Sequence, residues 1–162
     1  MRPIRTKGMK TAPLWSGPRR STRPVDLAAT TALIVGGALI IWSSAVHFHL
    51  WESVGYKQIP TIGPLFLLQS IGGLVIGLAV LAFRQVWAAL LGFGFALSTL
   101  GGFLLSVTHG LFGFTETWQA PFAMEAFAIE LTIAVVLAVA AALCLAGSAP
   151  SRAGRVTPLG ST

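Results

Sequence analysis

The sequence predicts an all-α protein, a four-helix transmembrane bundle with both termini cytoplasmic. Hydrophobic residues make up 54% of the 162 residues and charged residues only 10%, whereas a soluble domain carries roughly 25% charged residues. Four continuous apolar runs each match the length of about 20 residues that a helix needs to cross the hydrocarbon core. Lysine and arginine gather on one side of these runs, and that asymmetry sets the orientation in the membrane.

The four runs are continuous rather than alternating, which favours helices over the strands of a membrane β-barrel. The expected spans are residues 27–46, 64–83, 86–108 and 122–146.

Residues at the ends of the runs support these boundaries. Asp26 is suited to an N-cap or first-turn position, because a carboxylate interacts there with free backbone N–H groups and the positive end of the helix dipole. Pro64 opens the second run, where its missing N–H costs no helical hydrogen bond, and Pro121 stands just before the fourth. Only Arg84 and Gln85 separate the second run from the third. These two spans should therefore form a tight antiparallel hairpin.

Ten of the eleven basic residues lie in the N-terminal segment, at Arg84 or after residue 146, and Lys57 alone lies on the other side. Because the more basic side faces the cytoplasm, we expect a plasma-membrane protein with loops 47–62 and 109–120 facing outward.

Two tails should flank a membrane domain that covers residues 26–146. Residues 1–25 are expected to be a disordered basic cytoplasmic tail and residues 147–162 a flexible cytoplasmic tail. A basic tail beside a membrane helix contacts anionic lipid, and no motif or aromatic context points to nucleic acid. Two alternatives stay open: cleavage of a signal peptide after Ala45, and a start at Met9.

Small residues recur at helical spacing, as they do where membrane helices pack closely. The second run contains a G-x-x-x-G pair and the third a stripe of small residues at every fourth position: Gly73 and Gly77, then Gly94, Ser98, Gly102 and Ser106. We expect these residues to pack the bundle, or to contact a second copy in a homodimer or a partner membrane protein.

Polar and aromatic side chains gather on the side expected to face outward. The candidate residues of this polar cap are His47, His49, Trp51, Glu52, Tyr56, His109, Glu116, Trp118 and Glu125. Such a cap can bind a small ligand, a lipid or a partner subunit. The alternative is interfacial anchoring, since Trp and Tyr favour the headgroup zone of a bilayer.

Two polar residues lie below this cap, inside the expected spans. Gln69 lies about 7 Å inside the second helix and Glu130 about 12 Å inside the fourth, at 1.5 Å per residue. An intramembrane carboxylate should face the bundle interior and find a partner or stay protonated. We expect its partner to be Gln69, His47 or His109. This pair of residues suggests a pocket for a quinone, a lipid headgroup or a small solute, or else hydrogen bonds between helices.

The three histidines allow another hypothesis, a metal or haem site. Neutral imidazole binds zinc, copper and iron, so His47, His49 and His109 are candidate ligands, with haem, copper or quinone as candidate cofactors of a redox-associated subunit. A proton-coupled small transporter is a third hypothesis, supported by Glu130. An enzyme is disfavoured, because the sequence has no G-x-S-x-G elbow, no phosphate-binding loop and no outward cysteine.

Several segments carry a family pattern. They are His47-Phe-His-Leu-Trp51, Gly55-Tyr56, the run IPTIGPLFLLQ over residues 59–69, and GLFGFTETW over residues 110–118. In these segments the chain resembles a group of small four-helix integral membrane proteins of actinobacteria, over about residues 27–146. The resemblance implies an uncleaved first helix and a plasma-membrane location, and it implies no activity.

Overall fold

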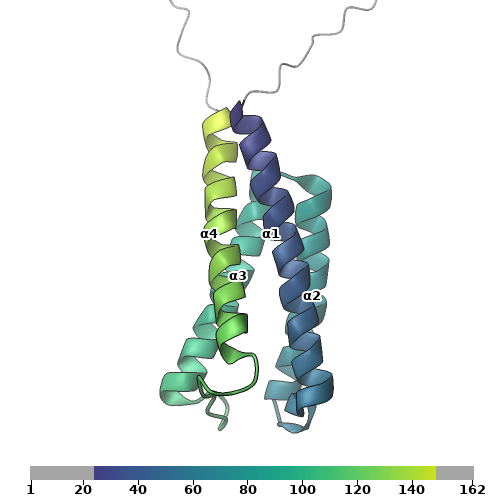
Figure 1. The fold of residues 1–162 in the computed structure, drawn as a ribbon, viewed down its shortest axis with the longest axis vertical. Coiled ribbons are helices and arrows are strands. Elements are labelled where there is room, and N and C mark those ends of the chain that lie inside the picture. Colours follow the sequence, from purple (N-terminus) through teal and green to yellow (C-terminus); the bar gives the residue numbers. More distant parts are fainter. Residues whose placement is uncertain (1–23, 149–162) are drawn as a thin grey trace, which may run out of the picture.

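The computed structural model describes residues 24–148, which form four long helices in an up-down-up-down arrangement (Figure 1). The helices are α1 (Pro24–His49), α2 (Ile62–Phe83), α3 (Val86–His109) and α4 (Ala123–Ser148). All four are long and apolar enough to cross a membrane. The predicted all-α four-helix fold is therefore confirmed. Apart from residues 24–25 and 147–148, which are helical, the predicted tails and Met9 lie outside the described residues.

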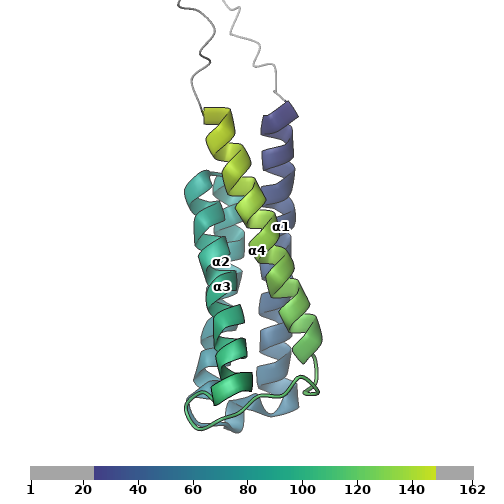
Figure 2. The same ribbon diagram turned by 90° about the vertical axis from the view of Figure 1, so that its left-hand side faces the viewer.

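The two ends of the bundle differ. Pro24 and Ser148 lie at the same end, together with the Arg84–Gln85 turn between α2 and α3 (Figure 1). At the opposite end, which we call the distal end, residues 50–61 join α1 to α2, and residues 110–122 cross from α3 to α4 (Figure 2).

The first helical segment is longer than the sequence suggested. α1 runs to His49 and continues as one π-helical turn over Leu50–Val54. Residues 46–54 contain no glycine or proline that would end a helix. The helical conformation ends at Gly55, whose φ of 103° is readily adopted only by a residue without a side chain. His47 and His49, which we expected to begin an outer loop, therefore lie in a helix.

The other helix boundaries differ by three residues at most, and the largest difference is the start of α1 at Pro24 rather than at residue 27. α2 begins at Ile62, so Pro64 is its third residue rather than its first. Phe122 has a φ of 63° and α4 begins after it, at Ala123. The predicted hairpin holds, because α2 ends at Phe83 and Arg84 adopts the left-handed conformation that closes the turn.

Small residues bring α1 and α2 close together. A Cβ atom added to Gly77 would lie 3.0 Å from the carbonyl oxygen of Gly37, and one added to Gly37 would lie 3.2 Å from the carbonyl oxygen of Gly77. A Cβ atom on Gly73 would crowd the side chains of Ser44 and Phe95. The G-x-x-x-G pair thus lies at a helix contact, as the sequence indicated.

The stripe on α3 behaves differently. Cβ atoms added to Gly94 or Gly102 would have no neighbour within 4 Å among the residues described, and Ser98 is exposed. Ser106 is the buried member of the stripe. Gly94, Ser98 and Gly102 therefore do not pack inside the bundle, which was one of the two roles that we expected, and contact with a second copy or a partner protein stays a prediction.

The core lies where α1 meets α4. Leu33, Ile40, Ile133 and Leu137 are fully buried there. Ser43 and Ser44, part of the alternative cleavage site, are also buried. α1 is therefore an integral part of the folded bundle.

α2 and α3 separate from each other toward the distal end (Figure 1). Phe95 of α3 fills the space between them at mid-height, where its ring lies 3.7 Å from a Cβ atom placed on Gly72. Beyond Phe95 the helices leave an open volume inside the distal half of the bundle.

Candidate functional site

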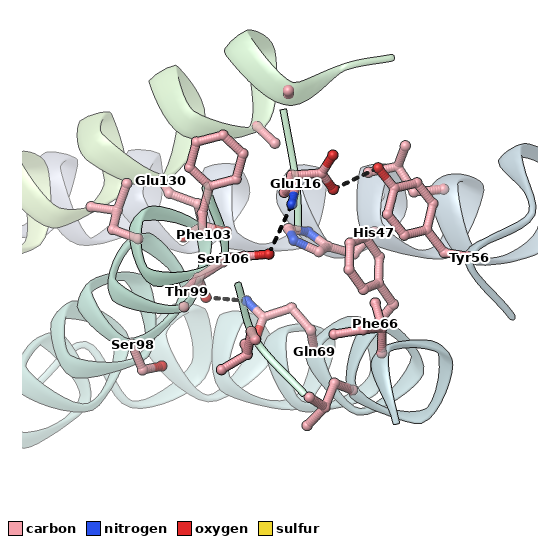
Figure 3. Close-up of a pocket in the computed structure, with 18 of the residues that line it drawn as sticks. His47, Tyr56, Phe66, Gln69, Ser98, Thr99, Phe103, Ser106, Glu116 and Glu130 are labelled. Atoms are coloured by element: carbon pink, nitrogen blue, oxygen red, sulfur yellow. Dashed lines mark hydrogen bonds between the residues drawn. The ribbon is translucent and has the colours of Figure 1, made fainter. Parts of the chain in front are cut away.

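A cavity of about 410 Å³ occupies this open volume between α2, α3 and α4, with His47 of α1 in its wall (Figure 3). Its size falls within the range of roughly 300–1,000 Å³ that is usual for ligand pockets. Most of the wall is apolar, and aromatic rings line it from three sides: Tyr56, Phe66, Phe95, Phe103, Phe114 and Phe127. A few polar side chains also face it: His47, Gln69, Ser98, Thr99, Ser106, Glu116 and Glu130.

Glu130 is the most deeply buried charged residue at the cavity. Only 1% of its surface is exposed, and its Oε1 atom accepts a hydrogen bond from the Ser43 hydroxyl. Its other carboxyl oxygen, Oε2, is buried and has no hydrogen-bond partner within residues 24–148. A polar atom buried without a partner is costly, and Glu130 lines the cavity, so a donor that reached Oε2 from the cavity would remove that cost. We expected Gln69, His47 or His109 to partner this carboxyl, and that expectation is wrong, since the partner is Ser43.

His47 belongs to the same hydrogen-bonded group. Its Nδ1 atom lies 2.9 Å from the carbonyl oxygen of Ser43 and 3.3 Å from the Ser43 hydroxyl. Because a carbonyl only accepts, Nδ1 carries the hydrogen, and Nε2 of the neutral ring is an acceptor. The ring packs against Phe66 at a centroid distance of 5.5 Å.

Gln69 connects the two helices that flank the cavity. Its Nε2 atom donates a hydrogen bond to Thr99 of α3, whose hydroxyl in turn donates to the carbonyl of Phe95 at 3.1 Å. As Figure 3 shows, Gln69 lies across the cavity from His47. The amide predicted to point into the bundle does so.

Tyr56 and Glu116 close the distal side of the cavity. The phenol donates a hydrogen bond of 2.7 Å to Oε2 of Glu116, and the Tyr56 ring stacks on Phe66 at 4.4 Å. Oε1 of Glu116 accepts from the backbone N–H of Thr117 at 3.0 Å. Burial, and then the adjacent Glu116 carboxylate, raise the pKa of Tyr56 above its usual value, so the phenol stays a donor near neutral pH.

Five of the predicted cap and interior residues therefore meet at one cavity: His47, Tyr56, Gln69, Glu116 and Glu130. The remaining six do not line it: His49, Trp51, Glu52, His109, Trp118 and Glu125. Glu52 pairs with Lys57 at 3.2 Å, and the Lys57 ammonium lies 5.8 Å from the Trp51 ring centroid.

The three histidines diverge. His49 is exposed and its ring meets Phe122 at 5.5 Å, while His109 is exposed beside Thr108. Within the described part of the chain, no three His, Cys, Asp or Glu side chains are grouped closely enough to hold a metal ion. This geometry does not bring together the ligand set we considered.

Four polar residues were not predicted as site residues from the sequence: Ser43, Ser98, Thr99 and Ser106. Ser43 lies four residues before His47, on the same helix face, and that spacing was the available signal. Thr99 and Ser106 sit among apolar and small residues of α3, and the sequence alone does not show which face of α3 is turned inward.

The cavity opens sideways, between α2 and α3. Leu65 and Leu68 of α2 line it and are 38% and 65% exposed, and on α3 Ser98 and Gly102 also line it. These positions lie on α2 and α3, which are long and apolar enough to cross a membrane. In a bilayer crossed by these helices, the opening would be turned toward lipid.

No family model, curated protein or solved structure matches this chain.

Proposed function

We propose that this chain is a multi-pass plasma-membrane protein that binds a lipid-soluble small molecule in the cavity between α2, α3 and α4. The ligand enters from the bilayer, between Leu68 of α2 and Gly102 of α3. Its apolar body lies against the aromatic walls, and its polar head reaches Glu130. The protein acts by binding and carries out no chemical step on the ligand.

The observation that supports this proposal most strongly is the position of Glu130 relative to the opening. A cavity open only to water would suit a soluble ligand, and a closed one would suit structural packing. Here a buried carboxyl oxygen without a partner belongs to a residue that lines the cavity, and the mouth of that cavity lies between two helices that are apolar enough to contact lipid. That combination favours a ligand that is apolar along most of its length and polar at one end.

We also propose an orientation and a family. The distribution of the basic residues supports an orientation with both termini in the cytoplasm and the distal end outside. The pattern shared with small four-helix actinobacterial membrane proteins includes His47, Tyr56 and Gln69, which line the cavity.

The binding proposal is tested by filling the mouth of the cavity. Gly102 lines the cavity and has open space around an added Cβ atom, so Gly102→Leu should fold and obstruct the opening. Gly94→Leu is the matched control, because Gly94 also has open space but does not line the cavity. Each protein is purified in lipid nanodiscs, and bound apolar compounds are extracted and identified by mass spectrometry.

We expect one compound to co-purify with the wild type and with Gly94→Leu, and to be depleted at least about tenfold in Gly102→Leu, equivalent to about 1.4 kcal/mol of binding free energy. Equal recovery from both variants would count against the cavity as the binding site.

Proton-coupled transport is a second candidate, and the buried carboxyl of Glu130 favours it. Its test is flux of the identified compound across proteoliposomes, driven by a pH gradient. Flux that continues unchanged in Glu130→Gln would remove this candidate without affecting the binding proposal.

A further inference from the structure

We propose that the ligand is a lipophilic amine, bound as its ammonium ion with the charged nitrogen at the Glu130 carboxylate. This inference rests on the proposed function and specifies the chemical class of the ligand. Both the hydrogen bonds that the cavity already makes and its charge favour this class of ligand.

The hydroxyl groups that line the cavity are already committed as donors. Tyr56 donates to Glu116 at 2.7 Å, and Ser98 and Thr99 donate to the carbonyl of Phe95 at 2.7 and 3.1 Å. Ser106 points its hydroxyl to the carbonyl of Phe114 at 3.4 Å. None of these hydroxyl hydrogens is left over for a ligand.

The acceptors are not all committed. Oε2 of Glu130 has no partner among residues 24–148, and Nε2 of His47 accepts when Nδ1 donates to Ser43. Glu116 has a donor on each of its oxygens, from Tyr56 and from the backbone of Thr117. Gln69 keeps one amide hydrogen that Thr99 does not accept, so the cavity offers a single donor beside its uncommitted acceptors. The place where a donor is lacking is Oε2 of the ionised Glu130, and a ligand that completes this carboxylate donates a hydrogen bond to it.

The charge of the cavity leads to the same class of ligand. Two carboxyl groups line it, and no lysine or arginine among residues 24–148 does. Lys57 is the one lysine or arginine at the distal end of the described chain, and its ammonium is paired with Glu52 at 3.2 Å. A carboxylate in a low-dielectric interior is stabilised strongly by an opposite charge. An ammonium ion supplies that charge and the missing donors together.

The aromatic walls of the cavity also favour an ammonium ion. Phe66, Phe103 and Phe127 line the cavity, and the faces of aromatic rings attract a desolvated cation. The carbonyl oxygens of a quinone only accept hydrogen bonds and would face Oε2 with no donor of their own. A fatty acid would add a third carboxylate to a cavity that already has two.

Three compounds with the same apolar cage and different heads separate these classes: adamantan-1-amine, adamantan-1-ol and adamantane-1-carboxylic acid. Tritiated adamantan-1-amine is bound to the full-length protein in nanodiscs and displaced by each unlabelled compound. We expect the amine to displace its own label at concentrations at least about tenfold lower than the alcohol, and the acid not to displace it.

The variant Glu130→Gln keeps the shape of the side chain and removes the charge, so we expect the affinity for the amine to fall at least about tenfold. Glu125→Gln is the matched control, because Glu125 lies on α4, is exposed and does not line the cavity. It should bind the amine like the wild type. The elution volume in gel filtration shows whether each variant is folded.

The two levels of the proposal fail differently. If the wild type binds the alcohol or the acid as tightly as the amine, with Gly102→Leu blocking all three, the cavity binds lipophiles and the amine class is wrong. If none of the three binds the wild type and no compound co-purifies, the proposed function itself is wrong. The comparison of head groups uses the wild type, so it decides the question even if Glu130→Gln does not fold.

Discussion

Ser43 of α1 donates a hydrogen bond to Glu130 of α4 across 87 positions of sequence. This bond joins the two helices that form the core and fixes one oxygen of the carboxyl, so that the other oxygen remains without a partner at the cavity. One contact therefore contributes both to the stability of the bundle and to the chemistry of the site.

The variant Ser43→Ala should destabilise the bundle. It leaves both oxygens of a buried carboxyl unsatisfied, and a buried polar group that loses its partner costs roughly 1–3 kcal/mol. Thermal unfolding in detergent measures the effect. The control is Thr132→Ala, since Thr132 is exposed on α4 and its hydroxyl bonds only to the carbonyl of Ala128 in the same helix. Equal unfolding temperatures for the two variants would show that the bond between α1 and α4 adds nothing.

Much of the fold follows from the sequence, because the length of an apolar run and the width of a bilayer are matched physically. The same logic places the Arg84–Gln85 hairpin. The end of α1 was harder to predict, since residues 47–54 are polar enough for a loop but contain no helix breaker before Gly55. Polarity alone does not end a helix, whereas a residue with positive φ does.

The sequence predicts how deep Gln69 and Glu130 lie in the bundle, but it does not predict their hydrogen-bond partners. Counting residues along a helix places Gln69 and Glu130 below the polar cap. Which side chains they meet depends on the rotation of each helix about its axis, and the apolar residues that surround these helices on all sides leave that rotation undetermined. Serine and threonine were overlooked for this reason, although Ser43 and Thr99 are the hydrogen-bond partners of Glu130 and Gln69.

The contact between α1 and α2 should not tolerate a larger residue at Gly77. In Gly77→Ala the new Cβ atom would lie 2.7 Å from Cγ1 of Ile41 and 3.0 Å from the carbonyl oxygen of Gly37. Overpacking of this kind costs typically about 1–3 kcal/mol, so the unfolding temperature in detergent should fall. Gly101→Ala is the control, because an added Cβ atom there has no neighbour within 4 Å in the described structure. A Gly77→Ala protein as stable as Gly101→Ala would contradict the close approach of the two helices.

Tyr56 should resist ionisation. It is the only tyrosine of the sequence, so the ultraviolet absorbance of phenolate reports this one side chain. Burial and the neighbouring Glu116 raise its pKa, and we expect little phenolate at pH 10, where an unperturbed tyrosine is about half ionised. In Glu116→Gln the negative charge is absent, and the titration should begin at lower pH than in the wild type. Half-ionisation of wild-type Tyr56 near its ordinary value would contradict the buried pair with Glu116.

The raised pKa of Tyr56 should also make the free energy of unfolding decrease as the pH rises in the alkaline range. Above about pH 10 the unfolded state loses the Tyr56 proton while the folded state keeps it. The stabilising contribution of Tyr56 is thus fully present below that pH and decreases as the pH rises. The variant Tyr56→Phe removes the titrating group, so its free energy of unfolding should fall less steeply in the alkaline range. Parallel alkaline unfolding curves for the two proteins would show that another group is responsible.

The orientation of the bundle can be read from cysteine labelling in intact cells. Ser53 is exposed at the distal end and Gln85 is exposed in the turn at the opposite end. In a background where Cys144 is replaced by alanine, we expect Ser53→Cys to react with a membrane-impermeant maleimide from outside, because ten of the eleven basic residues lie on the other side of the spans. Gln85→Cys should react only after the membrane is opened with detergent, which also shows that both cysteines are accessible in the folded protein. Labelling of Gln85→Cys but not of Ser53→Cys in intact cells would show that the orientation is the opposite of the one expected. The Tyr56–Glu116 side of the cavity would then face the cytoplasm.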